Sequence, residues 1–402
     1  MSDFYQHDLI STLHRLNGGG EHLEKELEKI SRSRSIALVL PSLYSELEGP
    51  ALRGIVRELS RIGYLGEVVI SMNRMDRRQF QRALKFFKLL EQPHRIIWND
   101  GTRMNRLYAR LQEQGLARYV SGKGFNVWLA FGYLLAGRKA DVIVTHDCDI
   151  VNYDRNFLAR LAYPVASASL SYEYCKAYYA RVTDRMYGRV TRLFVTPLIR
   201  SLIQILGHHP LLVYLDNFRY PLAGEFALSA DLATAIRNPG DWGLEIEILA
   251  EVYRNTAARR ICQIELAESF EHKHQELARG GTPEGLMKMA FDIARSLFRT
   301  LASEGLTFAP ATFTSLKFAY VRVAREMLQR YQHDARVNGL VFDARDEGLA
   351  IETFVDAIEL AAKTFLKDRL VVTLIPSWSR VESAMPGFLD ELREQVDKDN
   401  AL

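Results

Sequence analysis

The sequence predicts an α/β fold with a mostly parallel sheet, followed by an α-helical C-terminal region. Between residues 34 and 280, short apolar runs rich in β-branched residues alternate with segments of helical periodicity. Such alternation is typical of right-handed βαβ units, whose sheet is covered on both faces. From residue 281 onward, long segments carry apolar residues at helical spacing. We therefore expect three regions, 1–33, 34–280 and 281–402.

The elements follow in order along the chain. Residues 1–33 are expected to be an N-terminal helical extension, because HLEKELEKI has the pattern of a short amphipathic helix. Expected strands, short and β-branched, are 36–41, 67–72, 95–98, 141–146 and 261–267. Helices of the α/β region, recognised by their periodicity and by glycines near their ends, are 51–63, 77–90 and 124–137. Helices of the C-terminal region are 284–302, 316–331 and 350–366.

Composition excludes several classes of protein. The 52 Lys and Arg against 49 Asp and Glu give a net charge of +3, which is too small to indicate a nucleic-acid partner. Three cysteines without CxxC spacing support neither a zinc ribbon nor a disulfide framework. The N-terminus lacks the pattern of a signal peptide, and no stretch of 18 apolar residues occurs. We expect a cytoplasmic protein without a membrane span.

Polar side chains follow the expected strands, at the edge where open parallel sheets bind their ligands. After the first strand come Ser42, Ser45 and Glu46; after the second come Asn73, Arg74 and Asp76; after the fourth come Asp147 and Asp149. Because the carboxyl ends of parallel strands lie at one edge of the sheet, these groups should converge on one site.

The stretch VIVTHDCDIVN (142–152) runs from a buried strand directly into two carboxylates, Asp147 and Asp149. Two carboxylates one residue apart can hold a hard cation such as Mg²⁺ or Mn²⁺, which typically bridges them to a diphosphate. An acidic pair in a loop is more often solvated, but the position after a strand favours the metal. Lys123, between two glycines before a helix, could meet a phosphate, although the Walker A spacing is missing.

Three later segments are ambiguous when taken singly. PLAGEFALS (221–229) could be a helix entry, and WGLEIEILAEVY (242–253) an amphipathic helix with solvated acids. His272 and His274 lie on one side of an extended segment and could both face a metal. A pair of this kind is more often not a ligand.

Taken together and in this order, the GKG turn, the DCD motif, GRVT (188–191), PLAGEFA, WGLEIEIL and the EH motif resemble one known family. They resemble the retaining GT-A glycosyltransferases similar to glucosyl-3-phosphoglycerate synthase, over residues 34–280. The resemblance implies a Rossmann-like nucleotide-diphospho-sugar transferase fold and a Mg²⁺ or Mn²⁺ cofactor. It also implies transfer of glucose, with UDP-glucose as the favoured donor, to 3-phosphoglycerate.

The resemblance also implies roles for individual residues. Contacts to the nucleotide sugar fall on Pro41, Leu43, either Ser45 or Glu46, Lys123 and Asp147. The metal falls to Asp149 and His272, and Glu225 lies beside the donor sugar as a positioning group. Acceptor contacts fall on Gly188, Arg189 and Thr191, with Lys176 and His274 nearby. The chemistry implied is displacement of a nucleoside diphosphate with retention, in which Asp149, Lys123 and Glu225 are the catalytic set.

Some positions depart from the family pattern and leave alternatives open. VVISMNRMD replaces an aspartate- and serine-rich loop after the second strand, which leaves the nucleotide open. His274 and Phe270 stand where asparagine and arginine are common. The alternatives are a synthase that transfers mannose from GDP-mannose, a sugar-phosphate nucleotidyltransferase, and a non-catalytic nucleotide-sugar binding module. The apolar stripes of the C-terminal helices further suggest a homodimer, although a purely intrachain helical cap would explain them nearly as well.

Overall fold

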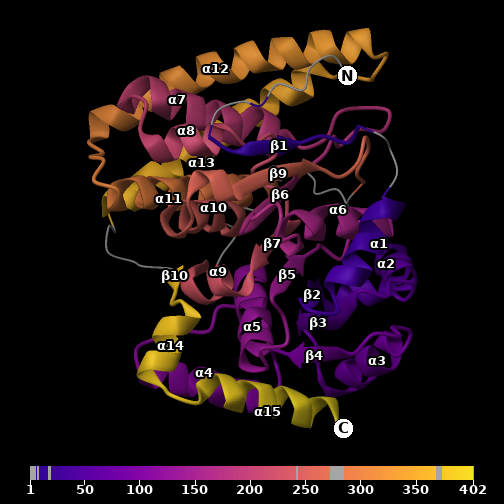
Figure 1. The fold of residues 1–402 in the computed structure, drawn as a ribbon. Coiled ribbons are helices and arrows are strands. Elements are labelled where there is room, and N and C mark those ends of the chain that lie inside the picture. The colour runs from indigo at the N-terminus through magenta and orange to yellow at the C-terminus, as the bar shows by residue number, and fades with distance from the viewer. Residues whose placement is uncertain are drawn as a thin grey trace.

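The computed structural model describes Gln6 and residues 9–16, 20–240, 243–271, 285–367 and 374–401. Within these residues, eight strands form one sheet (Figure 1). Their order across the sheet is β1 (Ser11–Leu13), β9 (Ile261–Glu265), β6 (Tyr174–Tyr178), β7 (Phe226–Ser229), β5 (Val142–Thr145), β2 (Ile36–Leu43), β3 (Leu65–Asn73) and β4 (His94–Trp98). All neighbours are parallel except that β7 is antiparallel to β5 and β6. The predicted mostly parallel α/β sheet is confirmed.

Helices cover both faces of this sheet, as the alternating pattern predicts. On one face lie α1 (Glu21–Ile30), α2 (Pro50–Leu59), α3 (Arg77–Phe87) and α6 (Arg155–Ala166). On the other lie α4 (Thr102–Glu113), α5 (Lys123–Ala136), α7 (Thr196–Leu206), α8 (Pro210–Asp216), α9 (Ala230–Ala235) and α10 (Leu244–Asn255). Burial on both faces explains why β2, β3 and β5 are almost continuous apolar runs.

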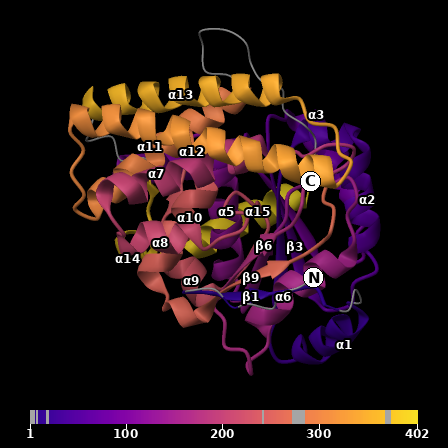
Figure 2. The same ribbon diagram turned by 90° about the horizontal axis from the view of Figure 1, so that it is seen from above.

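The C-terminal region is helical, as predicted. Its main helices are α11 (Gly285–Ser303), α12 (Pro310–Val337) and α13 (Ala344–Lys367). They lie side by side against the η2 turn (Val190–Val195) and α7, at the β1 end of the sheet (Figures 1 and 2). Among the described residues, no helix is both long enough and apolar enough to cross a membrane.

The N-terminal segment differs from its predicted helical state. Ser11–Leu13 form β1, which pairs in parallel with β9 from Ser11 opposite Cys262 to Leu13 opposite Ile264. Only α1 confirms the expected helix. Three residues carry no periodicity of their own, and the unpaired edge of β9, which lies about 250 positions away in the sequence, decides their conformation.

The opposite edge of the sheet is covered by the end of the chain. There α14 (Trp378–Ala384) and α15 (Phe388–Asn400) follow β10 (Leu374–Ile375), which pairs with β8 (Asn238–Pro239). Trp378 stacks on Trp128 of α5 at 4.0 Å between ring centroids, and its Nε1 donates to Trp128 O. Asn400 bonds both Ile96 N and Ile96 O, so one side chain takes the place of a strand on the edge of β4. The C-terminal region therefore spans both edges of the sheet.

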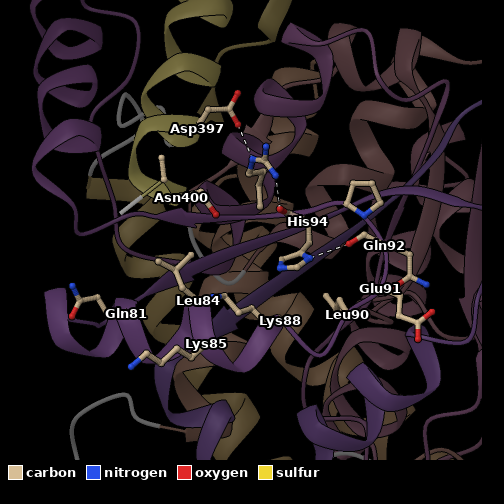
Figure 3. Close-up of a pocket in the computed structure, with 13 residues that line it drawn as sticks. Gln81, Leu84, Lys85, Lys88, Leu90, Glu91, Gln92, His94, Asp397 and Asn400 are labelled. Carbon is tan, nitrogen blue, oxygen red and sulfur yellow. Dashed lines mark hydrogen bonds and ion pairs between the residues drawn. The ribbon is translucent and has the colours of Figure 1, made fainter.

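A pocket of about 960 Å³ lies beside β4, lined mainly by polar residues of α3, α15 and the turn before β4 (Figure 3). His94 Nδ1 lies 3.0 Å from Gln92 O, and Arg95 Nε donates to Asp397 Oδ1 at 2.7 Å. Because the pocket adjoins the amino end of β4, it is separate from the carboxyl edge where the predicted site residues lie.

Candidate active site

Asp147 and Asp149 follow β5 at the edge where β2, β3 and β5 end. His146 N donates to Val39 O at 3.1 Å, which holds the start of the loop against β2. Cys148 is buried, whereas both aspartates are half-buried. Burial raises the pKa of the Cys148 thiol, which therefore stays neutral and packs into the core. Cys148, the middle residue of DCD, thus anchors the loop in the core, while the two flanking carboxylates stay partly exposed at the edge of the sheet.

Lys123, the first residue of α5, lies between two carboxylates at this edge. Its Nζ is 2.7 Å from Asp147 Oδ1 and 3.1 Å from Glu245 Oε1. Burial disfavours the ammonium, but the attraction of Asp147 and Glu245 outweighs it and raises the pKa of Lys123. The structure brings Lys123 and Asp147 together and adds Glu245, which the sequence analysis did not select.

Glycines around this ion pair are required by close packing. A Cβ on Gly224 would lie 2.2 Å from Asp147 Oδ2 and 2.7 Å from Lys123 Nζ. A Cβ on Gly124 would lie 1.9 Å from the Pro239 carbonyl oxygen. The position after Lys123 must therefore be glycine because it packs against the backbone of β8.

The acids of α10 are not solvated, contrary to the amphipathic interpretation. Glu245 and Glu247 are 7% and 5% exposed, and Glu247 accepts a hydrogen bond from Ser296 Oγ of α11. Two residues two positions apart lie about 200° apart around a helix and cannot share one solvated face. This spacing is the signal that could have identified Glu245 as a site residue, because α10 is covered on both sides.

Glu225 lies just before β7, where a helix entry had been considered. The FALS segment is instead a strand, because it pairs with both β5 and β6. Glu225 is fully buried, and its Oε2 accepts a 2.7 Å hydrogen bond from Tyr179 OH. The ring of Tyr179 lies 4.9 Å from that of Tyr220 and 3.9 Å from that of Phe270. Sequence reasoning missed both tyrosines, which lack any local signal.

Lys176 lies on β6, next to the turn that carries Glu225. It is 1% exposed, its Nζ donates to Ala223 O at 2.6 Å, and it lies 5.5 Å from the Phe226 ring centre. The structure therefore places it beneath the GEF turn, and its acceptor role stays a prediction. Burial lowers the pKa of Lys176 from 10.5 to about 8, although Glu245 and Glu225 oppose the shift.

This pKa predicts how stability depends on pH. Between pH 8 and 10 the unfolded chain still holds a proton that folded Lys176 has released, so the free energy of unfolding rises with pH. Relative to Lys176→Met, the wild type should gain about 1 kcal/mol per pH unit in this interval. Urea denaturation of both proteins at several pH values measures the difference. Parallel pH profiles would contradict the prediction.

The GRVT stretch is held against α13 by ion pairs. Gly188 has φ +74°, and a Cβ there would lie 3.4 Å from Tyr220 OH. Arg189 is bonded to Asp346 and, through Nε at 2.7 Å, to Glu347 Oε1. Arg192 Nη2 lies 3.0 Å from the other oxygen of Glu347. Thr191 is buried in the π-helical turn η2, a conformation often found at functional sites.

The predicted nucleotide loop follows β2. Pro41 and Leu43 belong to β2 itself, and Ser45 and Glu46 lie in the short η1 turn (Tyr44–Glu48). Pro41 is buried, whereas Ser45 is exposed. The remaining short turn, η3 (Ala258–Arg260), precedes β9.

A buried amide network that includes the predicted Asn73 joins this edge to α5, through two further asparagines that the sequence did not indicate. Asn126 Nδ2 donates to Asn73 Oδ1 at 2.5 Å, and Asn99 Nδ2 donates to Asn126 Oδ1 at 2.9 Å. Asn73 also reaches Ser121 Oγ at 3.4 Å, in the loop before Lys123. Of the other polar groups predicted after β3, Asp76 caps α3 by a capping box.

The predicted metal ligands are only partly described. Asp149 lies in the loop after β5, while His272 and His274 lie outside the described residues. Glu271, the residue before His272, is held to the segment that follows the DCD motif by two hydrogen bonds. Val151 N donates to Glu271 O at 2.8 Å, and Glu271 N donates to Asn152 Oδ1 at 3.0 Å. Within the described part of the chain, no three candidate ligands gather. Glu271 nevertheless adjoins the DCD loop, and the assignment of a metal to Asp149 and His272 stays a prediction.

Comparisons with known proteins place this geometry in a family. A glucosyl-3-phosphoglycerate synthase of Persephonella marina is 48% identical over 402 residues, which is 100% of both chains. Another, of Methanococcoides burtonii, is 38% identical over 397 residues, 98% of this chain and 96% of the relative. No family model matches the sequence.

Solved structures agree at the level of the fold. The Mycobacterium tuberculosis glucosyl-3-phosphoglycerate synthase in complex with Mn²⁺, UDP-glucose and phosphoglyceric acid is similar with a TM-score of 0.52 and 22% identity. The match covers 75% of this chain and 89% of that one. The similarity confirms the GT-A-type fold expected from the motifs. Because full-length relatives exceed 30% identity, the chain belongs to the glucosyl-3-phosphoglycerate synthase family of glycosyltransferases.

Proposed function

We propose that this chain transfers glucose from a nucleoside-diphosphate sugar, UDP-glucose in the first place, to the hydroxyl of 3-phosphoglycerate. The full-length relatives carry the name of this activity, and a solved homologue binds UDP-glucose and phosphoglyceric acid with Mn²⁺. The observation that carries the proposal is the cluster of Lys123, Asp147 and Glu245 beside Asp149. It provides a fixed cation and carboxylates at the ligand-binding edge of the sheet.

The residues of the chain have separate tasks in this reaction. Lys123 supplies positive charge where charge develops on the departing diphosphate, and preorganised charge of this kind is usually the largest catalytic contribution. A divalent cation held by Asp149 and His272 would neutralise the same diphosphate. Glu225, buried and bonded to Tyr179, acts as a positioning residue and not as a nucleophile. Retention then follows from attack on the face that the diphosphate leaves, with a phosphate oxygen accepting the acceptor's proton.

One assay separates the candidate activities. The protein is incubated with UDP-, GDP- and ADP-glucose and with GDP-mannose, each with 3-phosphoglycerate or glycerate, and nucleoside diphosphate release is measured. We expect release with a glucose donor and 3-phosphoglycerate, and an α-configured product by NMR. Preference for GDP-mannose would indicate the mannosyl alternative. In a parallel incubation with a nucleoside triphosphate and glucose 1-phosphate, release of pyrophosphate would indicate a nucleotidyltransferase. Binding without release would indicate a non-catalytic module.

We assign acceptor binding to the GRVT stretch, whose Arg189 would meet the phosphate of 3-phosphoglycerate. Arg189→Ala should raise the KM for 3-phosphoglycerate about 10- to 100-fold, as expected for a lost charge-assisted hydrogen bond. The KM for the donor should barely change. Glu347→Gln disturbs the same ion pairs but keeps the guanidinium, and should change the KM far less. If glycerate serves as well as 3-phosphoglycerate, or if Arg189→Ala weakens the donor instead, the assignment is wrong.

We further propose that the chain works in the cytoplasm as a homodimer. Its three cysteines are buried free thiols, which suits a reducing compartment. On α12, Phe318 is 70% exposed, and Leu349 on the neighbouring α13 is 42% exposed. Light scattering at micromolar concentration should give twice the mass of the chain, and Phe318→Glu should lower it to that of a monomer. A monomeric wild type would contradict the dimer.

A further inference from the structure

Arg181 lies between the predicted metal corner and the GRVT stretch. The loop after β6 folds back on itself, because Tyr187 N donates to Arg181 O at 2.8 Å and Val182 pairs with Met186. This turn brings Gly188 next to Arg181, so that a Cβ on Gly188 would lie 4.0 Å from Arg181 Cδ. The arginine thus adjoins the motif assigned to the acceptor, although it lies outside that motif.

The other side of Arg181 faces the segments that surround Asp149. Phe270 N donates to Ala180 O at 2.9 Å, and Ser269 Oγ donates to Val182 O at 2.7 Å. One residue further, Glu271 is bonded to the DCD loop through Val151. Asp149 contributes attraction to the Arg181 guanidinium, which also bonds to Tyr220 OH. Arg181 is therefore positioned where the DCD loop, the segment that follows β9 and the acceptor loop meet.

The Arg181 guanidinium has fewer partners among the described residues than the two arginines of the GRVT segment. Arg189 and Arg192 are both paired with carboxylates of α13. Among the described residues, the partly buried Arg181 has a tyrosine hydroxyl as its hydrogen-bond partner, and its buried Nε has no partner. A buried polar atom without a partner costs free energy, which a ligand can recover. The guanidinium is planar, so Nε and one Nη can donate two parallel hydrogen bonds to the two oxygens of a carboxylate.

The chemistry of the acceptor indicates which anion belongs there. 3-Phosphoglycerate has a single hydroxyl, and the carbon that bears it also bears the carboxylate, whereas the phosphate is on the next carbon. The hydroxyl must approach the sugar at the metal corner, so the carboxylate stays close to that corner while the phosphate reaches outward to Gly188–Thr191. We propose that Arg181 binds the carboxylate of the acceptor and so selects a 2-hydroxy acid over the corresponding alcohol. This inference rests on the proposed function.

The test uses Arg181→Ala and Arg181→Lys, with Arg185→Ala as the matched control. Arg185 belongs to the same loop but is exposed and paired with its neighbour Asp184. Arg181→Ala should raise the KM for 3-phosphoglycerate about 10- to 100-fold, with Arg181→Lys intermediate and Arg185→Ala unchanged. sn-Glycerol 1-phosphate, which keeps the phosphate, the hydroxyl and its configuration but carries CH2OH in place of the carboxylate, should compete equally well against wild type and Arg181→Ala. The KM for the donor should not change.

Three results would overturn the inference. If Arg181→Ala weakens binding of sn-glycerol 1-phosphate as much as that of 3-phosphoglycerate, the arginine binds the phosphate. If the KM for the donor rises instead, it binds the diphosphate, and an unchanged KM for both substrates means that it binds neither. Arg181→Lys and Arg181→Gln decide the question if the alanine variant does not fold. Calorimetric titration of 3-phosphoglycerate needs no turnover, so it tests Arg181 even if the wild type fails to transfer glucose and the proposed function itself is wrong.

Discussion

Asp149→Ala is expected to lower kcat for glucosyl transfer at least about a thousandfold, because it removes the carboxylate assigned to the cation that neutralises the leaving diphosphate. The fold should survive, since Asp149 is half-buried and lies in a loop that Cys148 anchors independently. Steady-state kinetics and a thermal melt measure the two effects. Asp231→Ala, which removes an exposed carboxylate from the first turn of α9, is the matched control and should keep full activity.

Removal of the metal should reproduce the effect of Asp149→Ala. Wild type treated with excess EDTA should lose activity and recover it with Mg²⁺ or Mn²⁺. Titration of Mn²⁺ in the presence of UDP should detect binding to the wild type and much weaker binding to Asp149→Ala, independently of turnover. His272→Ala should behave like Asp149→Ala. Full turnover in excess EDTA would contradict the assignment of a metal to this site.

Lys123→Met is expected to lower kcat about a hundredfold and to destabilise the protein. The lost rate corresponds to the charge that Lys123 supplies to the departing diphosphate. The lost stability arises because Asp147 and Glu245, both within ion-pair distance of Lys123, would face each other without a cation. Removing one partner of a buried ion pair is strongly destabilising. Because the Lys123 side chain is 27% exposed, we expect a loss of about 2 kcal/mol.

The dependence on pH distinguishes these two effects of Lys123→Met. Repulsion between the two carboxylates raises the pKa of one of them in the folded variant, so the folded state holds a proton that the unfolded state has released. The variant should therefore be less stable at pH 8 than at pH 5, relative to wild type. Lys123→Met/Glu245→Gln removes the repulsion and should recover stability but not kcat. If both recover, Lys123 is structural only.

Local sequence patterns were sufficient to predict the central strands of the α/β sheet and some residues of the candidate site. The runs that form β2, β3 and β5 are buried on both faces, and their composition reflects this burial directly. Lys123 and Asp147 each follow a recognisable element boundary, and the rule that ligands bind at the carboxyl ends of strands places them together. The motif order was sufficient to indicate the family that the full-length relatives confirm.

The sequence by itself determined the fold class, the edge of the sheet that carries the site and several of its charged residues, because these depend on periodicity and on short motifs. Only the tertiary structure decided that Ser11–Leu13 join the sheet, that FALS is an antiparallel strand and that Arg189 pairs with α13. It alone also brought Glu245 to Lys123 and placed Arg181 beside Gly188. Each of these depends on partners tens to hundreds of positions away in the chain. Pairing of strands and ions across such separations follows from how the layers pack, and local periodicity does not encode it.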